Sequence, residues 1–227
     1  MFTLAFPVLT AVVLGEAFGN SPQEDTEHVF RGMGAMDYYL PAYVALAISA
    51  LGLVSIPVHL AGYRDKGILR RFRASGISAG SLLGAQVGVM IVMSAAGTVL
   101  LLAVGYSMYE VRSPASIGGV LLAHLVCVVI FACIRVMLGA VIPSARAAQG
   151  VGLFLFLVMM FLARTGPPWK VLGGLMERVG DFLPLTHAAV ALQDPWNGLG
   201  TNAAELGVMA AFAVATALIA LRTFRWD

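Results

Sequence analysis

Long uncharged blocks are the feature that most limits what this sequence can fold into. Residues 81–106 run without a single charged side chain. A helix needs roughly 20 consecutive apolar residues to cross a bilayer core, so such a block is typical of a membrane span. The chain is 59% hydrophobic and 11% charged, whereas soluble domains are about 45–50% apolar and about 25% charged. The sequence therefore excludes a soluble globular domain and predicts an all-α integral membrane protein.

Similar apolar blocks recur along the chain and predict six transmembrane helices. We place these spans at residues 2–19, 38–62, 81–106, 116–142, 149–163 and 203–221. The first block lacks a positive n-region and an A-x-A cleavage site, so we expect it to be retained as a helix. The fifth is short for a bilayer, so we expect the segment after it to dip back toward the membrane. The loops leave little room for a second folded domain, and we predict one domain over residues 1–227.

Charged residues predict how the helices are oriented. The basic residues of three segments fall on one side of a six-span arrangement: Arg64, Lys66, Arg70, Arg71, Arg73, Arg146, Arg222 and Arg225. Most of the acids fall on the other side: Glu24, Asp25, Glu27, Asp37, Glu110, Glu177, Asp181 and Asp194. Because an excess of Lys and Arg marks the cytoplasmic side, we expect both termini in the cytoplasm and the protein in the cell membrane.

Residues 165–202 contain proline and tryptophan between short apolar runs. This pattern predicts two helical pieces, at about residues 169–179 and 185–192. Backbone interrupted by proline at membrane depth needs protein or water around it. We therefore expect either an external cap or a half-inserted hairpin between the fifth and sixth spans.

Ionisable residues within the spans are few: Glu16, His59, His124 and Arg135. Burying such groups in hydrocarbon is costly. We expect Arg135 to snorkel or to form a structural pair rather than contact substrate, and His124 to be a packing residue. No Asp or Glu lies in the middle of a predicted span, which argues against a transporter driven by its own ion gradient.

Catalytic, metal and nucleotide motifs are missing from the sequence. It has no G-x-x-x-x-G-K-[ST] phosphate loop, no H-E-x-x-H and no G-x-S-x-G, so we expect no ATPase site or other enzymatic activity in this chain. Cys127 and Cys133 fit neither a disulfide framework nor a metal site, and we interpret them as small apolar residues. We expect no bound cofactor, no metal and no nucleic-acid partner. The energy for any transport would come from a partner or an ion gradient.

Two further patterns concern packing and docking. Gly15 and Gly19, and then Gly80, Gly84 and Gly88, repeat at four-residue spacing, and we expect these small faces to support helix packing within the chain. The stretch YRDKGILRRFRASG, residues 63–76, forms an amphipathic helix if written from Arg64. That helix could anchor on anionic lipid headgroups, or it could dock a soluble partner, and the residues alone leave both open.

Three stretches resemble one known family, the membrane subunits (permeases) of ABC-2 type ABC transporters, which export drugs, antibiotics and polysaccharides. They are YRDKGILRRFRASGISAGSLLGAQ after the second span, FLPLTHAAVALQDPWNG before the sixth, and the ending LRTFRWD. With the six-span layout, the resemblance covers nearly the whole chain. The second stretch, close to the family's P-L-T-H-x-x-x-A-L run, is the most specific.

The resemblance implies a division of labour between subunits. The loop after the second span would contain a coupling helix that contacts a cytoplasmic ATPase through Asp65, Gly67, Leu69, Arg70, Arg71 and Arg73. An extracellular helical hairpin would include Pro184, Leu185, Thr186 and His187. Two permease copies, as a homodimer or heterodimer surrounded by membrane lipid, would work with two ATPase subunits that bind ATP and Mg.

The function that the resemblance implies is export of an amphiphilic substrate, such as a drug, an antibiotic or a lipid-linked compound. ATP hydrolysis on the separate ATPase subunit would drive it. Two alternatives remain at this point: an ion-coupled secondary transporter, and a membrane scaffold subunit that transports nothing.

Overall fold

The computed structural model describes residues 2–20, 30, 32–55, 71, 74–76, 79–163, 165–166 and 174–223. Over these ranges the chain is helical and contains no strand, which confirms the predicted all-α class. The helices are α1 (Phe2–Phe18), α2 (Ala35–Ala50) with the π-helical turn η2 (Leu51–Ser55), α5 (Ala79–Met108), α6 (Ile117–Val141), α7 (Ala145–Leu162), α8 (Leu175–Asp181), α9 (Pro184–Trp196) and α10 (Ala203–Thr223).

Five helices in the described ranges are long and apolar enough to cross a bilayer. They are α2 together with η2, α5, α6, α7 and α10. The apolar part of α1, Ala5–Phe18, is shorter than these five helices and is not among the candidate spans. The structure thus supports five of the six predicted spans by length and composition, and the span at residues 2–19 remains a prediction.

Two spans begin three or four residues earlier than the sequence predicted. The second begins at Ala35 rather than at residue 38, and its α-helix gives way to a π turn after Ala50; the predicted residues 56–62 lie outside the described ranges. The fifth begins at Ala145 rather than at residue 149, because the Ser144 side chain accepts a hydrogen bond (3.2 Å) from the Ala147 amide and caps the helix. At 18 residues, α7 is therefore not the short span that was expected.

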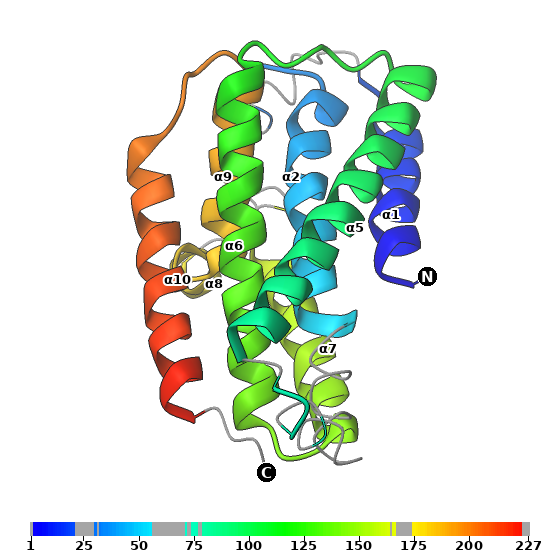
Figure 1. Cartoon of the computed structure of the whole chain (residues 1–227). Helices are drawn as coiled ribbons and strands as arrows, with labels where there is room; N and C mark the ends of the chain where they lie inside the picture. Colours follow the sequence, from blue (N-terminus) through cyan, green and yellow to red (C-terminus); the bar gives the residue numbers. More distant parts are fainter. Residues whose placement is uncertain are drawn as a thin grey trace.

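The helix α2 forms the centre of the bundle. Of its membrane-span window, 94% is buried, against 17% for α10 and 39% for α6. In the view of Figure 1, α6 stands in front of α9 and α10 lies to their left, while α2 lies to the right of α6 and α5 crosses in front of it toward α1. The outer helices turn large apolar side chains outward, such as Val92, Phe154 and Leu218. A buried central helix inside an apolar shell is the arrangement that a lipid solvent favours.

The predicted hairpin is two helices, of which α9 lies inside the bundle. Pro184 occupies the first turn of α9, where its missing amide proton costs nothing. Apart from His187, every residue of α9 is buried, and the helix contacts α2, α6 and α10. This packing places α9 within the helix bundle, and the position of the hairpin relative to the membrane remains a prediction. The predicted helix at residues 185–192 is longer at both ends, and residues 167–173 of the first piece lie outside the described ranges.

Of the glycines expected to pack, Gly15 makes a close contact, as does Gly152, which was not expected, whereas Gly19 has nothing within 4 Å of an added Cβ atom. A side chain at Gly15 would collide with the Tyr109 ring, and one at Gly152 would collide with the Leu53 carbonyl oxygen, where α7 meets η2. A Cβ atom added at Gly84 or Gly88, however, would meet nothing within 4 Å. The expectation that this pair supports packing within the chain was therefore wrong among the described residues.

Candidate functional site

The residues expected to contact an ATPase fall almost entirely outside the described ranges. This applies to Asp65, Gly67, Leu69, Arg70 and Arg73. Arg71 is described: it is helical and exposed, and its carbonyl accepts a hydrogen bond from the Ser75 amide at 3.0 Å.

Other basic residues of the same predicted side gather at one end of the bundle. The start of α7, which contains Arg146, and the end of α10, which contains Arg222, lie at that end (Figure 1). Arg146 and Arg222 are both exposed. This grouping agrees with the predicted charge asymmetry, although which end faces the cytoplasm remains a prediction.

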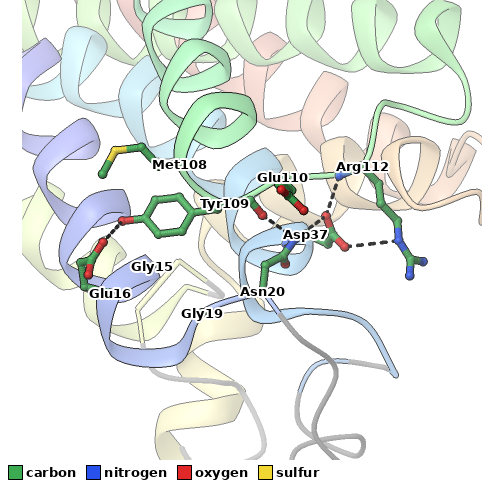
Figure 2. Close-up of a pocket in the computed structure, with 9 residues that line it drawn as sticks. All are labelled: Gly15, Glu16, Gly19, Asn20, Asp37, Met108, Tyr109, Glu110 and Arg112. Atoms are coloured by element: carbon green, nitrogen blue, oxygen red, sulfur yellow. Dashed lines mark hydrogen bonds and ion pairs between the residues drawn. The ribbon is translucent and has the colours of Figure 1, made fainter.

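At the opposite end, polar side chains join α1, α2 and the loop between α5 and α6. We call Glu16, Asn20, Asp37, Tyr109 and Arg112 the Asp37 network (Figure 2). The Asp37 Oδ1 atom accepts hydrogen bonds from the Arg112 amide (2.8 Å) and from Asn20 Nδ2 (3.3 Å). Asn20 Oδ1 accepts one in return from the Asp37 amide (2.9 Å). The Asp37 side chain is only 3% exposed.

The Tyr109 hydroxyl extends this network to α1. It donates to Glu16 Oε1 (3.1 Å) and lies 3.0 Å from the Val12 carbonyl oxygen. Burial, together with the neighbouring Glu16 carboxylate, raises the pKa of Tyr109 above its ordinary value. The phenol therefore keeps its proton at neutral pH and remains a donor.

The Asp37 network lines a polar cavity of about 610 Å³. Figure 2 shows the Glu16 and Tyr109 side chains meeting on one side of it and the Asn20, Asp37 and Arg112 side chains meeting on the other. No cluster of three His, Cys, Asp or Glu suited to a metal ion occurs in the described part of the chain. The geometry instead holds the ends of three segments together.

The end of α9 is bound to this same region. Gln193 Nε2 donates to the Tyr38 carbonyl of α2 (2.9 Å), and Trp196 Nε1 donates to the Arg112 carbonyl (3.1 Å). The Ala115 amide donates to the Trp196 carbonyl at 2.9 Å. As a result, α9 is hydrogen-bonded to both the central helix and the loop that Asp37 holds.

The resemblance implied that four residues lie in the hairpin. In the structure these residues hold α9 against its neighbours. Leu185 is fully buried, and the Thr186 hydroxyl donates to the Gly180 carbonyl of α8 at 2.5 Å. His187 Nδ1 lies 2.5 Å from Glu205 Oε2 of α10. Pro184 begins the helix. The sequence reasoning did not find Glu205 or Gln193 as partners, because each pairs with a residue far away along the chain.

Arg135 forms a structural pair inside the bundle and does not snorkel. It is 1% exposed, and its guanidinium donates to the side-chain oxygen of Gln86 and to the Gln86 carbonyl (3.4 Å). This pairing joins α6 to α5 and confirms the structural alternative for Arg135. His59 lies outside the described ranges.

His124 packs between the same two helices. Its Nε2 atom lies 3.2 Å from Ser94 Oγ. The Ser94 hydroxyl also lies 3.0 Å from the Ile91 carbonyl oxygen, within its own helix. This agrees with the expected packing role.

Two apolar cavities open on the outside of the bundle. One, of about 340 Å³, lies between α5 and α6 over α2 and α9. The other, of about 620 Å³, lies between α1 and the end of α7 and reaches Tyr39. The hydroxyl of Tyr39 is already bonded to the Gly166 carbonyl at 3.0 Å.

These features define a helical, multi-pass membrane protein whose polar contacts concentrate at one end of the bundle. In a comparison with protein families, residues 1–195 match the ABC-2 type transporter family. The chain therefore belongs to the ABC-2 type transporter family, as the sequence predicted. Comparisons with curated proteins and with solved structures gave no match. Permeases of this family carry no ATPase site of their own and generally pair with a cytoplasmic ABC ATPase.

Proposed function

We propose that this chain is the permease subunit of an ATP-driven exporter that moves an amphiphilic compound out of the cytoplasm. The observation that carries this proposal is the family match over residues 1–195, which runs from α1 into the last turn of α9. The apolar cavities on the outside of the bundle support a substrate that is itself largely apolar.

The proposed contact with the ATPase is the basic stretch at residues 63–76. Arg70, Arg71 and their neighbours would dock on the partner, which would hold ATP and Mg, and both termini would face the cytoplasm. The exposed position of Arg71 supports such a role. The working unit would be two permease copies with two ATPase subunits.

The packing of α2 suggests how a movement of this stretch could travel. The stretch follows η2 in the chain, and α2 is almost wholly buried. At its other end, α2 is bonded to α9 through Gln193 and to the loop after α5 through Asp37. ATP-driven closure of the ATPase would thus favour one arrangement of α2, α9 and this loop over another, which is a shift of population between two states.

The test is a charge reversal in the full chain co-expressed with its ATPase. We expect an ABC ATPase to co-purify with the wild type, and the double substitution Arg70→Glu and Arg71→Glu to abolish both co-purification and ATP-dependent transport. Arg222→Glu is the matched control, since it reverses an exposed charge at the end of α10 outside the proposed contact. Unchanged ATPase binding in the double variant, with normal membrane insertion, would refute the proposed contact.

A further inference from the structure

The hydroxyl of Thr98 in α5 differs from several other Ser and Thr hydroxyls in the described helices. Ser and Thr side chains within helices commonly donate to a carbonyl one turn back, and Thr10, Ser94, Thr216 and Thr223 do so here. The buried hydroxyl of Thr98 has no hydrogen-bond partner. A polar group left unpaired in an apolar environment is costly, and this hydroxyl is free to donate to a further acceptor.

Thr98 lines the apolar cavity between α5 and α6. The floor of the cavity is formed by Val44 of α2 and Leu192 of α9. The titratable side chain in its lining is that of His124. A rotation of about 120° about χ1 moves the hydroxyl of a threonine to the staggered position that its methyl group or its Cβ hydrogen occupied. The hydroxyl of Thr98 can therefore face the cavity without any change in the backbone.

The mouth of this cavity opens toward the surrounding lipid. Val99 and Leu121, on the facing sides of α5 and α6, line the cavity and are exposed. Figure 1 shows α5 leaning away from α6 toward its C-terminal end, with α2 behind the two. At about 340 Å³, the cavity lies in the size range of small-ligand sites.

We propose that this cavity binds an alkyl chain that carries a carbonyl oxygen, with Thr98 as the hydrogen-bond donor to that oxygen. The apolar lining selects the chain, the lateral mouth admits it from the bilayer, and the unpaired hydroxyl selects the acceptor. A bilayer phospholipid and a free single-chain amphiphile both supply this chemistry. The site deepens the proposed function, which draws on the same cavity, but it lies within one chain and its occupancy needs no ATPase.

The test uses the purified full-length chain in nanodiscs without ATP, so that its outcome is independent of the exporter assignment. One sample contains phosphatidylcholine with a diazirine and an alkyne in one acyl chain, and another contains the corresponding photoactivatable palmitic acid. After irradiation, the labelled peptides are mapped by mass spectrometry. We expect adducts to concentrate on the cavity-lining parts of α5 and α6, and the probe that labels more strongly identifies the source of the chain.

Three variants make the test specific. Thr98→Val keeps the shape of the side chain and removes the hydroxyl, so we expect labelling to fall about three-fold, the effect of a typical membrane hydrogen bond. Ala95→Phe fills the cavity, and we expect it to remove most of the labelling. Thr216→Val is the control, because the Thr216 hydroxyl already donates to the Phe212 carbonyl.

Two results would overturn the proposal. The first is labelling spread evenly over the lipid-facing helices, including α10. The second is labelling in Thr98→Val and Ala95→Phe equal to that of Thr216→Val. Thermal melting of the delipidated protein keeps the test decisive if one variant folds poorly: added palmitic acid should stabilise the wild type more than Thr98→Val, and equal stabilisation would refute the role of the hydroxyl.

Discussion

Removing the carboxylate of Asp37 should release the loop between α5 and α6 from the end of the bundle. The side chain is 3% exposed and accepts hydrogen bonds from the Arg112 amide and from Asn20 Nδ2. Hydrogen bonds to a charged group contribute about 1.5–3 kcal/mol each, and we take the lower value because one bond is long. The Arg112 guanidinium lies 3.6 Å away but its side chain is 73% exposed, so that ion pair adds at most about 1 kcal/mol.

These contributions give a loss of about 3 kcal/mol for Asp37→Ala. In a chain of this length, 1 kcal/mol shifts Tm by roughly 2–4 °C. We therefore expect Asp37→Ala to lower Tm by about 6–12 °C, measured by tryptophan fluorescence of the protein in detergent.

Two companion variants separate the contributions. Asp37→Asn keeps an acceptor for the Arg112 amide, so we expect it to lose about 1 kcal/mol. Arg112→Ala keeps the amide and removes only the exposed ion pair, so its loss should stay within about 1 kcal/mol. If Arg112→Ala destabilised the protein as much as Asp37→Ala, the ion pair would be the main contact and this reasoning would be refuted.

Two further predictions concern contacts inside the bundle. Gln86→Leu should cost about 3 kcal/mol, because it removes the side-chain partner of the buried Arg135 guanidinium and leaves only the Gln86 carbonyl. The double variant with Arg135→Leu should recover much of that loss. Equal Tm values for the single and double variants would contradict the pairing. Gly152→Ala should cost about 1–3 kcal/mol by forcing α7 away from the Leu53 carbonyl, whereas Gly150→Ala, which has nothing within 4 Å, should be neutral or stabilising. Thermal melting measures both, and equal effects of the two alanines would show that the close approach is unimportant.

The spans could be predicted because an apolar block long enough to cross a bilayer depends only on local composition. The third and fourth were placed within two residues of α5 and α6. The start of α7 was misplaced because Arg146 was interpreted as part of a loop. Ser144 before an alanine-rich stretch was a helix N-cap signal that could have corrected this.

The polar contacts could be predicted only in part. Asp37 was interpreted as an acid of an outer loop, but it lies in the first turn of α2 and is buried. Its partners Asn20 and Arg112 are 17 and 75 positions away, and a single sequence does not show which distant residues meet. A structural pair for Arg135 was expected because burying an unpaired charge is costly. Its partner Gln86 was not expected, because it lies 49 positions away along the chain.

The most direct test of the proposed function is transport of a fluorescent amphiphile in proteoliposomes that contain the permease with its ATPase. We expect export that requires both ATP and the ATPase subunit, and no transport when a proton or sodium gradient is imposed without ATP. Transport that follows such a gradient in the absence of ATP would contradict the proposal and identify an ion-coupled secondary transporter. No transport under either condition, with both subunits folded and assembled, would point to the scaffold alternative.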